Sequence, residues 1–320
     1  MGRRNQPVEE LFANAQGGDR GALARLLSLI ERGADEARAI GRLASPLGGR
    51  AYTVGLTGAP GAGKSTLTSA IIGHLRTQGL EVAVLAIDPS SPFTGGAILG
   101  DRVRMQDHAT DPGVFIRSMA TRGHLGGLSL SAPEAIRLLD AIGREWVLVE
   151  TVGVGQVEVE IAGKADTTVV VVNPGWGDSV QANKAGLMEI ADIFVINKSD
   201  RKGTEETRRD LEQMLDLSDL PHETWRPPII AAVGTTAQGV PDLWEAVLRH
   251  RGAITENGVL AERRQFRLRE ELRDIVARRL EHKARAICGG ERWELLQHEV
   301  LHRQLDPWAA ADQMLAGVDA

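Results

Sequence analysis

The stretch Gly58-Ala-Pro-Gly-Ala-Gly-Lys64-Ser65 decides the fold of this chain. It matches the pattern G-x-x-x-x-G-K-[ST], and it stands directly between an apolar run, residues 52–57, and a segment with helical spacing, residues 65–77. Glycines at these positions let the backbone turn sharply, so that successive N–H groups point toward phosphate oxygens. The start of the following helix adds the positive end of its dipole. The stretch therefore predicts a phosphate-binding loop between a strand and a helix.

Around this loop, short apolar runs alternate with longer helical segments. The expected strands are residues 52–57, 82–87, 146–149, 168–172, 193–196 and 229–232. The expected helices between them are residues 65–77, 133–142, 181–190 and 204–215. Runs that are almost continuously apolar are typical of parallel strands buried on both faces. The alternation predicts an α/β fold of the P-loop NTPase type, with a doubly wound and mostly parallel sheet, over residues 51–252.

Helical parts are expected on both sides of this domain. Residues 1–50 contain an N-cap candidate, Asp19, followed by apolar residues at helical spacing: Leu23, Leu26, Leu27 and Ile30. Residues 253–320 contain an apolar stripe from Leu268 to Ile287 among many Arg and Glu residues, and a second helix is expected over residues 293–305. Two such helices cannot form a core alone. We therefore expect this part to pack on the domain or on another chain.

The composition excludes several classes of protein. With 42% hydrophobic and 25% charged residues, the chain of 320 residues is typical of a globular protein. A net charge of −6 gives no sign of a surface for nucleic acid or membrane. The single cysteine, Cys288, excludes an intrachain disulfide and a Cys-rich metal site, and we expect it to be a small packing residue. Without a signal peptide or a membrane span, the expected compartment is the cytoplasm.

Catalytic and magnesium-binding residues are expected around the loop. Lys64 would hold the β- and γ-phosphates of a nucleotide, and Ser65 would ligate Mg²⁺. Asp88 and Glu150 each follow a predicted strand, where ligands bind in open α/β folds, and Glu150 begins a variant of D-x-x-G. Asp101 follows in a Gly-rich loop. Lys64, Asp88 and Glu150 are thus the catalytic candidates, although each acid could also be a helix cap or a solvated charge.

The base is specified by Asn197-Lys198-Ser199-Asp200, directly after a predicted strand. The Asp200 carboxylate can accept two hydrogen bonds from guanine, whereas adenine lacks this pair of donors, so GTP and GDP are the expected ligands. The loop at Val233-Gly234-Thr235 is expected to close over the base by backbone contact, since it lacks the Ser-Ala that is frequent there. The expected nucleotide-binding residues are Gly58, Ala59, Pro60, Gly61, Ala62, Gly63, Lys64, Ser65, Thr66, Asn197, Lys198, Asp200, Val233, Gly234 and Thr235.

With these motifs in order, the chain resembles the MeaB/ArgK-type GTPases. These are chaperones of adenosylcobalamin-dependent acyl-CoA mutases, and they include the methylmalonic aciduria type A proteins. The resemblance extends over roughly residues 20–310 and depends on five segments: residues 58–66, 88–105, 116–127, 150–156 and 174–184. Val233-Gly234, Trp176 and Ala185 depart from the family pattern.

The resemblance implies a function and an assembly. The protein would be a homodimer joined by its C-terminal helical arm, which agrees with the apolar stripe of residues 268–287. Its GTP hydrolysis would be slow alone and faster on the mutase, and its cycle would gate cofactor loading and protect or reactivate the mutase. Glu in place of Asp at position 150 is a family feature. Gln156, Asp178 and Lys184 would belong to segments that switch with the nucleotide or sense the partner.

Other functions remain open at this point. A metal-insertion GTPase of the hydrogenase or urease maturation kind would share the loop and the guanine motif, but one cysteine and scattered histidines, among them His108 and His124, argue against it. A nucleotide-dependent kinase of an amino-acid transport system would pass phosphate to a protein instead of water. Intact Lys64, Ser65 and Asp200 argue against a degenerate binding module. No arginine finger can be assigned among the loop arginines: Arg102, Arg104, Arg117 and Arg122.

Overall fold

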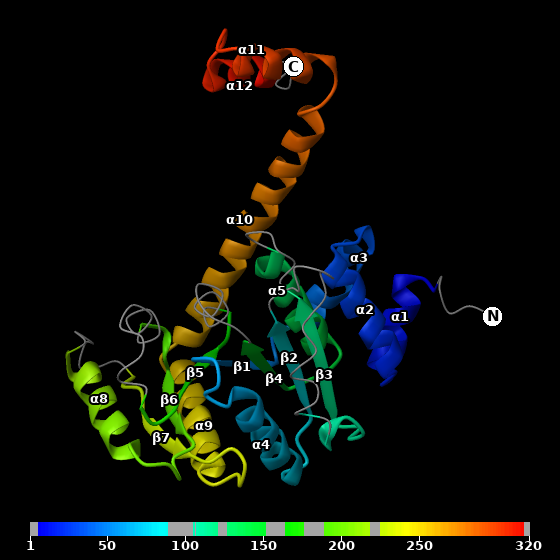
Figure 1. Ribbon diagram of the computed structural model, residues 1–320. Helices are drawn as coiled ribbons and strands as arrows, with labels where there is room; N and C mark the ends of the chain where they lie inside the picture. Colours follow the sequence, from blue (N-terminus) through cyan, green and yellow to red (C-terminus); the bar gives the residue numbers. More distant parts are fainter. Residues whose placement is uncertain are drawn as a thin grey trace. The chain divides into compact units, whose positions relative to one another are not determined.

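A computed structural model of the chain describes residues 6–88, 105, 107–120, 127–151, 164–175, 189–217 and 225–316. It divides into two units, Met1–Arg267 and Leu268–Ala320. The first unit contains a seven-stranded sheet with helices on both faces, and the second consists of helices (Figure 1). Helix α10, Val259–Ile287, begins in the first unit and ends in the second.

The sheet is parallel throughout, in the order β3-β2-β4-β1-β5-β6-β7. Strand β1 lies in the middle of the sheet, between β4 and β5. Strands β2, β3 and β4 lie on one side of β1, and strands β5, β6 and β7 lie on the other. In open sheets of this kind, ligands bind beyond the carboxyl ends of the strands where the order reverses. The strands are β1 Tyr52–Thr57, β2 Val82–Asp88, β3 Val114–Ala120, β4 Trp146–Thr151, β5 Thr167–Val172, β6 Ile193–Asn197 and β7 Ile229–Ala232.

Two layers of helices cover the sheet. Alternate strand residues face opposite layers, so the central strands are buried along their whole length. One face packs against α4 and α9. The other face packs against α1–α3 with α5, and against α8 over β5 and β6. These helices are α1 Val8–Gln16, α2 Arg20–Arg32, α3 Asp35–Ala44, α4 Lys64–Thr77, α5 Gly127–Ala141, α8 Thr204–Leu217 and α9 Val240–Glu256.

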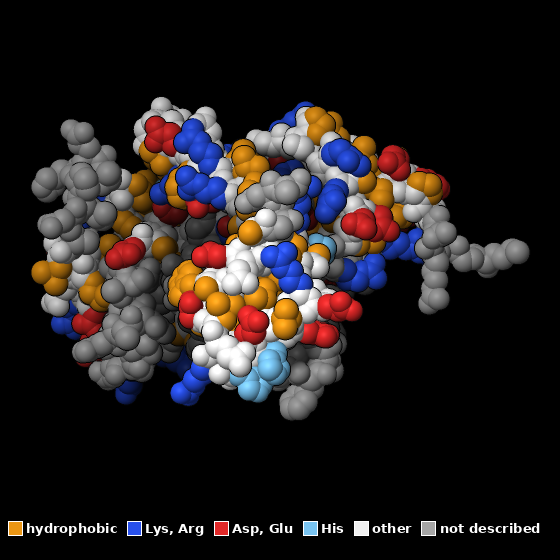
Figure 2. All heavy atoms as spheres, turned by 90° about the horizontal axis from the view of Figure 1, so that it is seen from above, with side chains coloured by type: hydrophobic (Ala, Val, Ile, Leu, Met, Phe, Trp, Pro, Cys, Tyr) orange, Lys and Arg blue, Asp and Glu red, His pale blue; other side chains and the backbone are white. Residues whose placement is uncertain are grey.

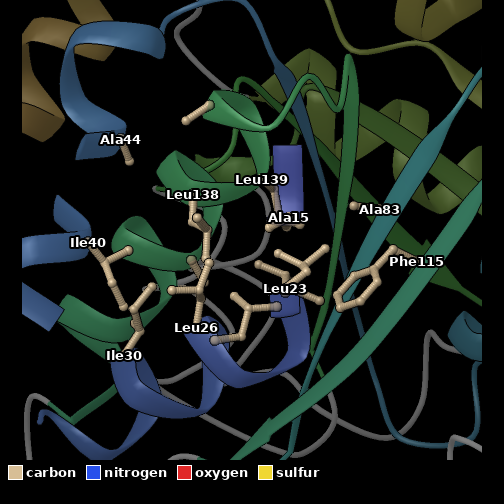
Figure 3. Packing of buried hydrophobic residues seen from close by; sticks show 14 of the residues in the cluster. Ala15, Leu23, Leu26, Ile30, Ile40, Ala44, Ala83, Phe115, Leu138 and Leu139 are labelled. Carbon is tan, nitrogen blue, oxygen red and sulfur yellow. The ribbon is translucent and has the colours of Figure 1, made fainter. Parts of the chain in front are cut away.

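The N-terminal helices form part of the main core. As predicted, Asp19 caps α2, and its Oδ1 accepts hydrogen bonds from the backbone nitrogens of Gly21 (2.7 Å) and Ala22 (3.1 Å). The apolar side chains predicted for α2 are buried against α5 and β3. Figure 3 shows Leu23 beside Phe115 of β3, while Leu26 faces Leu138 of α5. The first fifty residues therefore complete one face of the sheet.

The predicted fold class is confirmed, and so are the six predicted strands. The seventh strand, β3, was missed because Arg117 and Ser118 interrupt its apolar run. Helix α5 begins six residues before the predicted start and contains Pro133 in its interior. Most of the helix predicted over residues 181–190 lies outside the described residues.

The second unit leaves much apolar surface exposed. Helices α11, Glu291–Leu301, and α12, Pro307–Leu315, replace the single helix predicted there, and they bury only a small cluster: Leu296, Ala310 and Met314. Four α10 residues spaced four apart are 48–62% exposed: Leu268, Leu272, Val276 and Leu280. Cys288 lies near a helix end, directly after α10, as expected, but it is exposed, so the expectation that it is a packing residue was wrong.

The distribution of charged side chains on the surface agrees with the modest net charge of the chain. Basic and acidic side chains are interspersed over the face shown in Figure 2, with hydrophobic side chains among them. Among the described residues, no helix is both long enough and apolar enough to cross a membrane.

Candidate nucleotide-binding site

The loop between β1 and α4 has the backbone that its sequence predicts. Gly58, Gly61 and Gly63 have φ angles of 132°, 76° and 90°, which residues other than glycine rarely adopt. A Cβ on Gly58 would lie 2.0 Å from the carbonyl oxygen of Val171 in β5, and one on Gly63 would lie 2.4 Å from Asn197 Nδ2. The loop can therefore lie against β5 and β6 only because glycines occupy these two positions.

Lys64 and Ser65 form the first turn of α4, and both are buried. Lys64 Nζ donates to the carbonyl oxygens of Gly58 (2.5 Å) and Ala59 (3.3 Å), so its ammonium group lies inside the curve of the loop. A positive charge and the backbone amides at a helix start are thus brought to one point. This arrangement is suited to binding an anion such as a nucleotide phosphate.

Glu150 lies at the same edge of the sheet. It is in β4, paired in register with Leu56 of β1, and it is fully buried. The next residue, Thr151, donates through Oγ1 to the carbonyl oxygen of Leu56 (3.4 Å) and is 3.3 Å from Thr57 Oγ1. The structure therefore brings the predicted Glu150 to the strand that leads into the phosphate loop.

The remaining predicted acids are only partly placed. Asp88 ends β2, and its backbone pairs in register with Ala120, so it lies at the carboxyl edge of the sheet. Its side chain lies outside the described part of the chain, as do the predicted site residues Asp101, Gln156, Asp178 and Lys184. Within that part, no three His, Cys, Asp or Glu residues form a metal cluster. The Ser65 hydroxyl and the Glu150 carboxylate are nevertheless the hard oxygen donors that Mg²⁺ prefers, with nucleotide phosphates as its further ligands.

Asn197 connects three parts of the predicted site. Its Nδ2 donates to the carbonyl oxygen of Ala62 in the phosphate loop (2.8 Å), and its Oδ1 accepts from the backbone nitrogen of Gly234 (3.0 Å). Lys198 follows with a left-handed backbone, φ 59°, and its Nζ donates to the carbonyl oxygen of Gly61 (2.6 Å). Asp200, the predicted guanine-binding residue, is exposed in the next turn.

The loop after β7 explains one departure from the usual guanine loop. Val233 and Gln238 close it through an antiparallel bridge. A Cβ on Gly234 would lie 3.1 Å from the backbone nitrogen of Leu67 in α4 and 3.4 Å from Asn197 Oδ1. A larger residue would crowd α4, so glycine at this position keeps the loop close to Asn197.

One residue of this region had no signal in the sequence. Thr207 of α8 is buried, and its Oγ1 accepts a hydrogen bond from the backbone nitrogen of Gly175 (3.2 Å). This contact fixes the turn at the end of β5 to the helix that follows the guanine motif. Thr207 was missed because it stands in an ordinary helical pattern.

Two of these arginines and histidines, Arg117 and His108, are described, and both have structural partners. Arg117 of β3 forms a 2.7 Å ion pair with Glu31 of α2 and donates to Ser28 Oγ (3.0 Å), so the N-terminal helices engage it. His108 Nε2 lies 3.0 Å from the carbonyl oxygen of Ser69. The other candidates lie outside the described residues: Arg102, Arg104, Arg122 and His124.

Comparison with known proteins identifies the family of the chain. The family described as methylmalonyl-CoA mutase-associated GTPase MeaB matches residues 23–288. The chain belongs to this family. The match includes all seven strands and every described residue of the predicted nucleotide site.

Individual relatives extend over nearly the whole chain. A Pyrococcus horikoshii protein named as a GTPase is 52% identical over 312 residues, which are 97% of this chain and 98% of the relative. The mouse protein named methylmalonic aciduria type A homolog, mitochondrial, is 32% identical over 329 residues, 96% of this chain and 79% of the relative. The crystal structure of an LAO/AO transport system kinase has a TM-score of 0.72 at 27% identity, with both chains fully covered. This MeaB-family protein is therefore a GTPase with a P-loop fold.

Proposed function

We propose that this GTPase is a chaperone of an adenosylcobalamin-dependent acyl-CoA mutase, with methylmalonyl-CoA mutase as the first candidate. In this role, its GTP cycle gates cofactor loading and protects or reactivates the mutase. The observation that carries the proposal is the match to a mutase-associated GTPase family over residues 23–288. The mouse relative, named for methylmalonic aciduria, supports the same class of partner.

Each predicted site residue has a role in this proposal. The loop amides and Lys64 would hold the β- and γ-phosphates, while Asp200 would select guanine and Asn197 would hold the base loop against the phosphate loop. Ser65 and Glu150, with Asp88 and Asp101, would hold Mg²⁺, directly or through water. When bound, Mg²⁺ neutralises the charge that develops on the transferring phosphate.

Slow hydrolysis in isolation follows from these assignments. Glu150, Asp88 or Asp101 would orient the attacking water. Arg117, the one described arginine candidate, is engaged by Glu31. Phosphoryl transfer without an arginine finger is slower by on the order of 10³–10⁵. A partner that completes the site would then raise turnover.

The second unit would supply self-association. The exposed stripe Leu268, Leu272, Val276 and Leu280 presents apolar side chains on one side of α10, and an apolar stripe of this kind usually marks an interface. A homodimer joined by this arm agrees with the family resemblance.

The decisive experiment is GTP turnover by the purified protein with and without adenosylcobalamin-loaded methylmalonyl-CoA mutase. We expect a clear rise in turnover on addition of the mutase, with Lys64→Ala inactive in both conditions. Turnover that is indifferent to the mutase would contradict the chaperone role but not the GTPase activity. Preference for ATP over GTP would contradict the role of Asp200.

A second candidate function follows from the LAO/AO transport system kinase, which shares the fold along both entire chains. A kinase would transfer the terminal phosphate of the nucleotide to a bound protein. Incubation with γ-labelled GTP and a periplasmic amino-acid-binding protein separates the two functions. Label on the protein would favour the kinase, whereas free inorganic phosphate alone would favour the hydrolase.

A further inference from the structure

Three arginines at the start of α10 meet two buried carboxylates. Arg263, Arg264 and Arg267 are among the last residues of the first unit. Arg264 Nη2 lies 2.7 Å from Asp166 Oδ2, and Arg267 also pairs with Asp166. Arg263 Nη2 lies 3.1 Å from Asp192 Oδ1. These five residues are here called the arginine latch.

The two carboxylates stand at the amino edge of the sheet. Asp166 directly precedes β5 and accepts from the backbone nitrogen of Thr53 in β1 (3.0 Å). Asp192 directly precedes β6 and accepts from the backbone nitrogen of Thr168 in β5 (2.8 Å). The latch is therefore bonded to the starts of β1, β5 and β6.

Further polar contacts surround the latch. His250 is fully buried, with Nε2 3.1 Å from Asp192 Oδ1 and Nδ1 2.8 Å from Thr167 Oγ1. Arg264 also donates to the carbonyl oxygens of Gly49 (2.9 Å) and Ala51 (2.8 Å), in the segment that enters β1. Arg264 thus links α10, the entry to β1 and the start of β5.

The same strands end at the nucleotide site. Strand β1 leads into the phosphate loop, and β6 ends at Asn197, which bonds that loop. The five-residue rise from Asp192 to Asn197 is about 17 Å. Buried strands in a continuous sheet shift together, so a displacement at one end is transmitted to the other.

The chemistry of the latch makes it sensitive to such shifts. Buried ion pairs give less net stability than apolar packing of the same volume, but loss of one partner is costly. Their energy also depends steeply on distance in a low-dielectric interior. Around the latch, α10 has little apolar cover, since Phe266 is 61% exposed. The start of α10 is therefore attached largely by charge, with Val259 and Leu260 packing on the core.

We propose that the arginine latch couples the start of α10 to the nucleotide site through β1, β5 and β6. Nucleotide binding tightens the latch, and weakening the latch weakens nucleotide binding, because such a coupling is reciprocal. The inference rests on the GTPase activity and is independent of the chaperone role.

Hydrogen exchange on the unaltered, full-length protein tests whether nucleotide binding tightens the latch. Amide exchange in residues 259–267 is measured without nucleotide, with GDP and Mg²⁺, and with a non-hydrolysable GTP analogue and Mg²⁺. We expect exchange to slow by about fivefold or more with nucleotide, the lower end of ordinary coupling between sites. If exchange in residues 259–267 is equal in all three states and slows only in the phosphate loop, the proposed coupling is contradicted, whereas the GTPase activity is not.

Nucleotide affinity of variants tests whether weakening the latch weakens nucleotide binding. We expect Arg264→Lys to weaken GDP binding by about fivefold or more, because lysine cannot bond Asp166 and two carbonyl oxygens in the same geometry. Arg285→Lys is the matched control on the same helix, since Arg285 pairs with exposed Glu281 (2.6 Å). Arg267→Lys replaces Arg264→Lys if the latter does not fold. Unchanged affinity in a folded latch variant would contradict the proposal. No mutase is present in either test.

Discussion

Individual glycines set the shape of the phosphate loop, and two of them differ in a way that can be tested. A Cβ on Gly58 would lie 2.0 Å from the carbonyl oxygen of Val171, whereas one on Gly61 would have no heavy atom of a described residue within 4 Å. Both have positive φ angles, 132° for Gly58 and 76° for Gly61, so alanine is strained at either position. We expect Gly58→Ala to lower the free energy of unfolding by clearly more than Gly61→Ala, as measured in urea. Equal losses would show that β5 moves freely away from the loop.

Tyr52 is the only tyrosine of the chain, which makes its ionisation directly measurable. Burial raises the pKa of its hydroxyl to about 12, although the hydrogen bond with Thr167 Oγ1 (2.7 Å) acts in the opposite direction. The folded pKa of Tyr52 lies above its unfolded value of about 10. The contribution of Tyr52 to the free energy of unfolding is therefore present below pH 10 and is lost as the pH rises toward 12. Phenolate absorbance should therefore appear near pH 12 in the folded protein and near pH 10 in urea. A folded-state midpoint near 10 would contradict this burial.

Residue motifs predicted the phosphate loop and the guanine motif, because each is a contiguous stretch with its own chemistry. They did not predict the bonds between those stretches. Asn197 contacts Ala62 across 135 positions, and Arg264 contacts Asp166 across 98. The order of the strands in the sheet brings such pairs together, and short-range sequence patterns do not specify that order.

Among the strands, the six with apolar runs were predicted and the edge strand β3 was not. Strands β1, β4, β5 and β6 are apolar on both faces and therefore stand out in the sequence. The edge strand β3 carries Arg117, whose charge is paired with Glu31 from a distant helix. The ion pair with Glu31, which is distant in the sequence, thus allows Arg117 to lie in β3, although the local sequence pattern does not favour a strand there.

The start of α10 gives an acid-stability prediction at this scale. Burial tends to raise the pKa values of Asp166 and Asp192, but hydrogen bonds and charges from Arg264 and Arg267, and from His250 and Arg263, hold both below the ordinary range. Stability from these groups is therefore present above the unfolded pKa of about 3.9 and is lost as the pH falls through the lower folded values. Urea unfolding at pH 6 and pH 3 should show the loss.

Replacement of one carboxylate provides the control for that prediction. Asp166→Asn removes one titrating group, so the variant should be less stable at pH 6 and should lose less stability between pH 6 and pH 3. A pH dependence identical to that of the unaltered protein would show that Asp166 does not contribute to it.

For the molecule as a whole, the exposed face of α10 predicts self-association. We expect Leu272→Asp with Val276→Asp to convert a dimer to a monomer, because the two charges would be buried without partners in an apolar interface. Sedimentation velocity at micromolar concentration measures the result. Leu217→Asp is the control, since Leu217 is 84% exposed in the first unit. A monomer before substitution would exclude the arm as a dimer contact.

The central position of β1 also has a consequence for biosynthesis. The phosphate loop leaves the ribosome early, but two of the groups that shape it, Val171 and Asn197, follow more than a hundred residues later. At about 5–20 residues per second, the 135 positions between Ala62 and Asn197 take roughly 7–27 s to translate. Until the end of that interval the glycine-rich loop lacks β6, and for most of the interval it also lacks β5. The nascent chain therefore acquires its nucleotide site late, and nucleotide can assist folding only after about two thirds of the polypeptide has been made.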